Sequence, residues 1–128
     1  MHRPDTLAGV AVAAKDGNDR MRIALAGFLD GFYVRVADRQ GMIDVAPAIT
    51  ADRFVDAYLG AIGEHLARRW ELRVPAWTDD RRRVLDKPVF AGGLEPLKAL
   101  LLAQSPLAFR RRMIFVEHEP LRRARMPR

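Results

Sequence analysis

Arginine is the residue type whose number and spacing in this chain most strongly suggest recognition chemistry. A guanidinium group is planar, stays protonated and donates hydrogen bonds in a fixed fork that matches a phosphate or a carboxylate. Clustered arginines occur at four places: Arg68 and Arg69, Arg81 to Arg83, Arg110 to Arg112, and Arg122 and Arg123. No helix-turn-helix, zinc-finger or aromatic-basic motif accompanies them. The pattern therefore favours binding of phosphate or carboxylate groups in general and gives no support to base-specific reading of DNA.

Groups that attack a substrate, transfer protons or bind metals are sparse. The chain has no cysteine, which removes thiolate chemistry, disulfides and cysteine-based zinc sites. The three histidines, His2, His65 and His118, are scattered, and none has a second ligand at the helical spacing that metallohydrolases use. Ser105, the only serine, precedes a proline, which predicts a helix cap rather than a nucleophile. We expect no catalytic residue, no metal site and no cofactor.

Two pairs of residues keep an enzymatic alternative open. Asp52 and Asp56 are four residues apart on one predicted helix face and could bind a cation or share a proton. A solvated helix face is the simpler interpretation of these aspartates. Arg112 and His118 are separated by five residues, a spacing similar to the arginine-to-histidine motif of one superfamily of helical ribonucleases. That motif lies on a helix, whereas Met113 to Val116 is β-favouring.

Composition predicts a single globular domain with an uneven charge. The 128 residues, 49% hydrophobic and 30% charged, are enough to bury one core. Residues 110–128 hold seven Arg against two Glu, a net charge of +5, so the 22 basic and 16 acidic residues of the chain leave 15 against 14, or +1, for residues 1–109. We therefore expect a helical domain over 1–109 and a basic segment over 110–128 that binds an acidic surface or nucleic acid, or stays solvated.

Apolar spacing predicts helices in the first half of the chain, over 1–18, 19–38 and 50–73. The two clearer stripes consist of Met21, Leu25, Phe28, Leu29, Phe32 and Val36, and of Phe54, Val55, Tyr58, Leu59, Ile62, Leu66 and Trp70. Thr50 is the predicted N-cap of the last helix, and Gly41 predicts a turn over 38–44. Gly27 and Gly31 lie four residues apart, which predicts close packing against another helix.

Shorter signals follow in the second half. Thr78 predicts the cap of a short helix in the connector, and a leucine-rich run over 94–102 predicts another helix. The Ser-Pro pair at 105–106 predicts the start of the next helix, with Arg110 to Arg112 in solvent. Met113 to Val116 favours a strand but needs a partner strand.

Several short stretches between Phe54 and Val116 carry a resemblance to a known group of proteins. They are Val74-Pro-Ala-Trp-Thr78, Leu85-Asp86, Pro88 to Gly93, Leu97-Lys-Ala99, and Ser105-Pro-x-Ala-Phe-Arg-Arg-Arg112 through Ile114-Phe-Val116. On these residues the chain resembles small bacterial proteins that accompany toxin–antitoxin modules, or form the C-terminal part of helix-turn-helix regulators. It departs from them at Val89, Gln104 and Met113, which often read Trp, Glu and Asn. The resemblance implies an antitoxin-like or regulatory role, with a nucleotidyltransferase-like toxin as one kind of partner, and brings no catalytic residue.

These observations combine into one prediction of fold and function. We expect a single compact all-α domain of four to six helices with a basic C-terminal tail. We expect a cytoplasmic, non-enzymatic protein-binding module, plausibly an antitoxin, with no membrane span. The residues predicted to contact the partner are Arg110, Arg111, Arg112, Ile114, Phe115, Arg122 and Arg123. A nucleic-acid-binding regulator is the first alternative and a helical ribonuclease the second, and self-association stays open.

Overall fold

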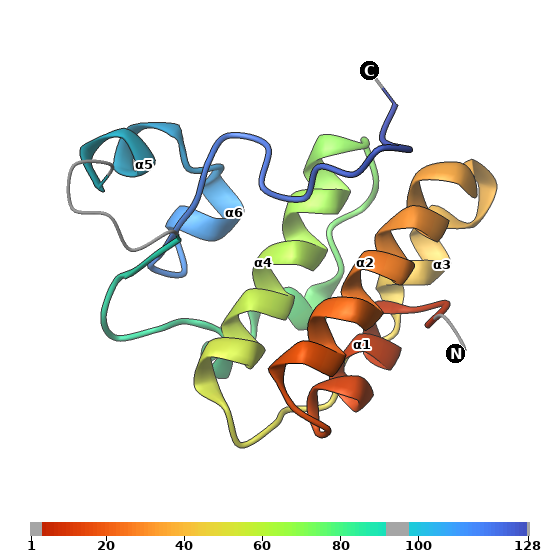
Figure 1. The fold of residues 1–128 in the computed structure, drawn as a ribbon, viewed down its shortest axis with the longest axis horizontal. Helices are drawn as coiled ribbons and strands as arrows, with labels where there is room; N and C mark the ends of the chain where they lie inside the picture. The colour runs from red at the N-terminus through yellow and green to blue at the C-terminus, as the bar shows by residue number, and fades with distance from the viewer. Residues whose placement is uncertain (1–3, 92–97, 128) are drawn as a thin grey trace.

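The computed structural model describes residues 4–91 and 98–127, which form six α-helices and one short parallel strand pair (Figure 1). The helices and strands are α1 (Leu7–Ala14), α2 (Asn18–Val34), α3 (Arg39–Asp44), α4 (Arg53–Arg69), α5 (Lys98–Gln104), α6 (Leu107–Arg110), β1 (Val89–Phe90) and β2 (Ile114–Phe115). Three 3-10 helices, η1 (Val36–Asp38), η2 (Ala76–Asp79) and η3 (Arg81–Arg83), lie in the connections. The predicted mainly α-helical single domain is confirmed.

The first two helices form a pair at the N-terminal side of the molecule. Thr6 begins α1 by accepting a hydrogen bond from the N–H of Gly9 on its Oγ1, at 3.2 Å. Gly17 lies at φ 111°, a conformation that favours glycine, and it turns the chain into α2. The predicted stripe of α2 is buried from Met21 to Phe32, but Val36 is 66% exposed because the helix ends at Val34.

The prediction of a turn over residues 38–44 is wrong, because residues 39–44 form helix α3. The guanidinium of Arg39 donates from Nε to the carbonyl of Phe32 and from Nη2 to the carbonyl of Tyr33, both at 2.9 Å. These carbonyls belong to the last turn of α2, where no helical N–H is left to bond them. Arg39 therefore ends one helix while it begins the next.

Helix α4 runs through the centre of the molecule. Every residue from Val55 to Ala67 is buried except Tyr58, which is partly exposed. Its N-cap is Asp52 and not Thr50, since Asp52 Oδ1 accepts from the N–H groups of Phe54 and Val55. Thr50 instead donates from its N–H and hydroxyl to Asp56 Oδ1, at 2.8 and 2.9 Å. The helix is therefore shorter at both ends than the predicted span of 50–73.

The predicted strand over Met113 to Val116 finds its partner earlier in the chain. β2 pairs in parallel with β1, with Val89 opposite Ile114 and Phe90 opposite Phe115. A parallel pair requires a crossover connection, which here contains α5 and α6. The helix predicted over 94–102 is observed from Lys98 onward, and its first residues lie outside the described part of the chain.

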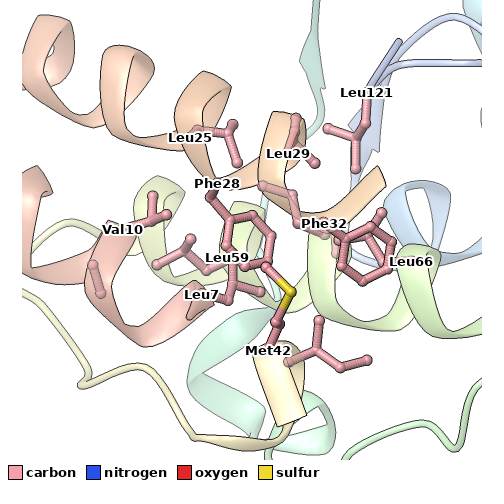
Figure 2. Close-up of a cluster of buried hydrophobic side chains, with 14 of the residues drawn as sticks. Leu7, Val10, Leu25, Phe28, Leu29, Phe32, Met42, Leu59, Leu66 and Leu121 are labelled. Carbon is pink, nitrogen blue, oxygen red and sulfur yellow. The ribbon is translucent and has the colours of Figure 1, made fainter. Parts of the chain in front are cut away.

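The hydrophobic core joins α1, α2, α3 and α4 and includes a residue from the C-terminal segment (Figure 2). Figure 2 shows Phe28 and Phe32 of α2 facing Leu59 and Leu66 of α4 across this core. Leu121, which is 3% exposed, closes it, while the segment around it crosses α4 toward α2 in Figure 1. The basic segment is thus anchored on the helices through its buried apolar residues, Ile114, Val116 and Leu121, while many of its charged residues stay exposed.

Candidate partner-binding surface

Arg112 lies inside the protein rather than at its surface. Its fully buried guanidinium donates from Nη1 to Glu64 Oε1 at 2.6 Å and to the carbonyl of Ala108 at 2.7 Å, and from Nη2 to the carbonyl of Thr78 at 2.7 Å. Burial lowers the pKa of Arg112, and the hydrogen bond to Glu64 acts in the opposite direction. The expectation that the whole arginine triplet stays in solvent is wrong for Arg112, because a carboxylate and two carbonyls replace water around it.

Glu64 binds three guanidinium groups from a buried position. Its Oε2 accepts from Nε of Arg68 at 2.7 Å, and its Oε1 lies 2.6 Å from Nη1 of Arg112 and 3.3 Å from Nε of Arg111. Burial by itself raises the pKa of Glu64, but the hydrogen bonds from Arg112 and Arg68 and the nearby positive charges outweigh it, so the pKa lies below its ordinary value. An ionised carboxylate with both oxygens engaged is a structural anchor rather than a general acid or base.

A second arginine, Arg83, is also buried. It donates to the carbonyl of Asp56 at 3.1 Å and to that of Pro47 at 2.6 Å, and its guanidinium lies 4.9 Å from the centre of the Trp77 ring. Arg83 thereby attaches the 3-10 helix η3 to α4 and to the chain that enters α4. Two of the four arginine clusters thus supply core residues rather than surface charge.

Two glycines of α4 make room for these side chains. A Cβ on Gly60 would lie 3.0 Å from Nε of Arg112, and a Cβ on Gly63 would lie 2.7 Å from the Trp77 ring. The sequence drew attention to a different pair, but at Gly31 a Cβ would meet only the terminal methyl of Met42, at 3.8 Å. On α4, Gly60 and Gly63 thus allow close packing, whereas Gly31 of α2 is not closely packed.

The other predicted contact residues divide between the surface and the interior. Arg110 and Arg122 are exposed, whereas Ile114 and Phe115 are 2% and 7% exposed. Ile114 and Phe115 are thus not exposed on the outside of the molecule, although Ile114 forms part of the wall of an apolar pocket beside the strand pair. The partner-binding role of the exposed arginines stays a prediction.

Arg111 and Arg123 reach the surface but already have partners. Arg111 donates to Asp79 at 2.9 Å in addition to its contact with Glu64. Arg123 donates through Nε and Nη2 to the two carboxylate oxygens of Asp30, both at 2.9 Å, which attaches the C-terminal segment to α2.

His65 also belongs to the packing between α4 and the C-terminal segment. Its side chain is 9% exposed, its ring packs edge-on against Phe109 with 5.5 Å between centroids, and its Nε2 lies 3.9 Å from Glu119 Oε1. Burial lowers the pKa of His65, the charge of Glu119 raises it, and that of Arg69 lowers it. The histidine is therefore held mainly in its neutral form.

Of the two residue pairs that left an enzymatic function possible in the sequence, three of the four side chains have structural roles. Asp52 caps α4 and Asp56 binds Thr50, so neither carboxylate is left for a cation or a shared proton. Arg112 has no donor directed to solvent for a ribonuclease substrate, while His118 is exposed. Among residues 4–91 and 98–127, no group of three His, Cys, Asp or Glu side chains could hold a metal ion.

Helices α5 and α6 leave large apolar side chains in solvent. Leu101 of α5 is buried, while its neighbours Leu100 and Leu102 are 49% and 47% exposed. Leu107, in the first turn of α6, is 48% exposed. We call Leu100, Leu102 and Leu107 together the leucine surface; Leu100 and Leu102 project on either side of Leu101, and Leu107 lies on the next helix. Figure 1 shows α5 at the end of the molecule opposite α1 to α3.

The three consecutive leucines at 100–102 are a sequence signal that could have predicted the exposed leucines of α5. Three consecutive residues of an α-helix point in directions about 100° apart, so Leu100, Leu101 and Leu102 cannot all face one core. Ser105 likewise does not cap α6. Its hydroxyl donates to the carbonyl of Leu101 at 2.5 Å and accepts from the N–H of Val116 at 2.8 Å, which attaches the residues after β2 to the end of α5.

An apolar pocket of about 370 Å³ lies beside the strand pair. It is lined by Phe54 and Tyr58 of α4, Val89 and Ala91 at β1, Ile114 and Val116 at β2, and by Glu117 and Pro120. Phe54 is 38% exposed and stacks on Tyr58, with 5.5 Å between ring centroids. The pocket is separate from the buried arginines and opens at the surface.

Comparison of this chain with family models, with curated proteins and with solved structures gives no match. Within the described residues, no helix has the length and apolarity required to cross a lipid bilayer. Function therefore has to be inferred from the surface and the interior of this molecule alone.

Proposed function

We propose that this chain is a non-enzymatic protein-binding module of the antitoxin type, which holds its partner on the leucine surface. The observation that supports the proposal is the exposure of Leu100 and Leu102 on both sides of the one leucine that attaches α5 to the domain. Two of the three consecutive leucines of this seven-residue helix are therefore about half exposed. Exposed apolar groups of this kind mark surfaces that another protein covers.

An exposed arginine next to the leucine surface on α6 supports a protein partner with an acidic rim. Arg110 is exposed and lies three residues after Leu107, so both side chains share one face of α6. Arginine beside apolar residues is a favoured composition at protein interfaces. Because several of the clustered arginines are buried or paired within the domain, the chain presents fewer free guanidinium groups than its net charge of +6 suggests.

The experiment expresses the product of the adjacent gene with and without this chain, and then isolates the complex. An antitoxin should relieve growth inhibition by that product and form a stable complex with it. Leu100→Glu, Leu102→Glu and Leu107→Glu should each weaken the complex by about tenfold or more, since each places a charge in an apolar interface. Stability should change by less than about 0.5 kcal/mol, because these positions are exposed.

The matched control is Val36→Glu, at a position that is 66% exposed near α2 and α3. It introduces the same charge far from α5 and should leave the affinity unchanged. Unchanged affinity in all three leucine variants would exclude the leucine surface. An arginine test should use Arg110→Ala alone, because Arg112→Ala would also disturb the fold.

A nucleic-acid-binding regulator stays as a second candidate because of one region of the surface. Arg69, Arg122 and Arg123 line a pocket of about 800 Å³ at the C-terminal segment. If this region binds nucleic acid, affinity should fall steeply with salt through counterion release, and Arg122→Ala should reduce the slope by about one. Binding that does not change between low and high salt would remove this candidate.

A further inference from the structure

We propose that the outer edge of β1 and the adjacent pocket bind an extended peptide segment of the partner, which adds to the sheet as a third strand. This inference rests on the proposed protein-binding function and specifies the form in which the partner docks. It is carried by the direction of backbone groups in β1, by the hydrogen bond that occupies the Val116 N–H at the opposite edge of the sheet, and by the chemistry of the pocket.

The backbone of β1 directs one residue away from its partner strand. The N–H of Val89 donates to the carbonyl of Met113 at 2.8 Å, and the N–H of Ala91 donates to the carbonyl of Phe115 at 2.9 Å. Backbone groups alternate in direction along a strand, so the N–H and carbonyl of Phe90 between them point to the outer side. In the described structure, neither of these two Phe90 groups takes part in the hydrogen bonds between β1 and β2.

The opposite edge of the sheet is partly occupied. The Ser105 hydroxyl accepts a hydrogen bond from the N–H of Val116 at 2.8 Å, so one backbone donor just after β2 is already used. We therefore place the added strand beside β1. Such addition supplies main-chain hydrogen bonds from the partner and pockets for its alternate side chains.

The pocket defines which peptide would fit. Val89 and Ile114 lie opposite each other in the ladder and present one sheet face to Phe54 and Tyr58 across the pocket. An apolar side chain of the added strand would enter this space, and the next one on the same face would follow two residues later. The exposed carboxylate of Glu117 at the rim favours a neighbouring Lys or Arg. We therefore infer an extended peptide with alternating apolar residues and a basic residue beside them.

The test compares Phe90→Pro with Phe90→Ala in the full chain. Both variants lose the ring that stacks on Phe115 at a centroid distance of 5.0 Å, but only proline also removes the outward N–H. Proline is tolerated on an edge strand when its nitrogen faces outward, so the bonds from Val89 and Ala91 should persist in both. Equal thermal midpoints for the two variants establish that they are a matched pair.

The probe is a displayed library of random peptides of about twelve residues, selected on the folded full chain and then synthesised. We expect enriched peptides with apolar residues at every second position and a Lys or Arg beside them. Their affinity should be about tenfold weaker for Phe90→Pro than for Phe90→Ala, because one acceptor of the peptide loses its donor. No enrichment, or equal affinity for the two variants, would overturn the inference.

A second variant covers the case in which Phe90→Pro does not fold. Phe54→Glu changes the rim of the pocket at a position that is 38% exposed, and it should abolish binding of the selected peptides, whereas Val34→Glu, at a 52% exposed position on α2, should not. Peptides that bind Phe54→Glu as well as the parent would also refute the site.

The two proposals fail in different ways. The peptide selection does not require the adjacent gene product, so it can fail while the leucine surface still binds that product. If selected peptides depend on the Phe90 N–H but the adjacent product neither binds nor is neutralised, the peptide site stands and the antitoxin role falls.

Discussion

The two sides of α4 are built from different chemistry. Toward α1, α2 and α3 the helix contributes Leu59, Ile62 and Leu66 to an apolar core (Figure 2). On the other side, α4 contacts η2, η3 and α6, which are short elements with little regular structure around them. On this side Arg83 and Arg112 donate hydrogen bonds to carbonyl oxygens, and Arg112 also donates to Glu64.

The difference teaches how irregular segments can be fixed in a small domain. Apolar contacts are non-directional, so helices that pack through them tolerate changes of side chain that keep the volume. A guanidinium has donors in fixed directions, and each one here specifies where a carbonyl of η2 or α6 must lie. The arginine side of α4 should accordingly be the less tolerant one.

The largest expected effect comes from removing Arg112. Arg112→Ala should lower the free energy of unfolding by about 3–5 kcal/mol, because a buried carboxylate and two carbonyls lose their donor. Leu59→Met, on the apolar side at an equally buried position, should cost less than about 1.5 kcal/mol. Denaturant unfolding of both variants measures the contrast, and equal losses would show that the two sides do not differ in tolerance.

The next effect comes from the glycine that contacts Trp77. Gly63→Ala should lower the free energy of unfolding by about 1–3 kcal/mol, since the added methyl would overlap the ring. Gly41→Ala is the control, because its Cβ would meet nothing within 4 Å and α3 is helical there. That substitution should stabilise the protein by about 0.5–1 kcal/mol. A stabilising Gly63→Ala would mean that Trp77 moves freely.

Acidification should weaken the packing of the C-terminal segment through His65. Burial holds the pKa of His65 below its ordinary value of 6.5, so as the pH falls below that value the unfolded chain binds a proton first. Stability due to His65 is complete above pH 6.5 and declines as the pH falls toward the lower pKa of the folded protein. His65→Phe should reduce this decline, measured by unfolding at several pH values. Leu66→Met, which alters the same helix without a titratable group, should keep the slope of the parent.

The smallest expected effect concerns two residues with left-handed backbone. Met113 has φ 67° and Glu71 has φ 60°, and such a conformation costs a non-glycine residue about 1–2 kcal/mol. Met113→Gly and Glu71→Gly should therefore each raise the free energy of unfolding, by about 0.5–1 kcal/mol after the added chain entropy of glycine is included. Thermal unfolding measures both, and a decrease at Met113 would indicate that its side chain contributes more by packing than its backbone costs.

Much of the helical framework could be predicted from local sequence, but the packing of the C-terminal side could not. The stripes of α2 and α4 are mostly buried as their spacing predicts, because a helical period depends only on residues within a few turns. The exceptions are Val36 and Phe54 at their ends, which are exposed. Two local signals misled at the C-terminal side. Ser105 before Pro106 has the pattern of a cap, yet its hydroxyl bonds Val116, eleven residues away. Arg112 has the pattern of a solvated cluster, yet it is fully buried.

By itself, the sequence determined that the chain is mainly helical, where its longest helices lie, and that it carries an excess of arginine. Only the tertiary structure decided which arginines are interior and which are surface. The physical reason is the range of the interactions: a guanidinium is buried only where oxygens surround it. Two of the three that bind Arg112 come from Glu64 and Thr78, which lie 48 and 34 residues away along the chain. No local pattern contains that information.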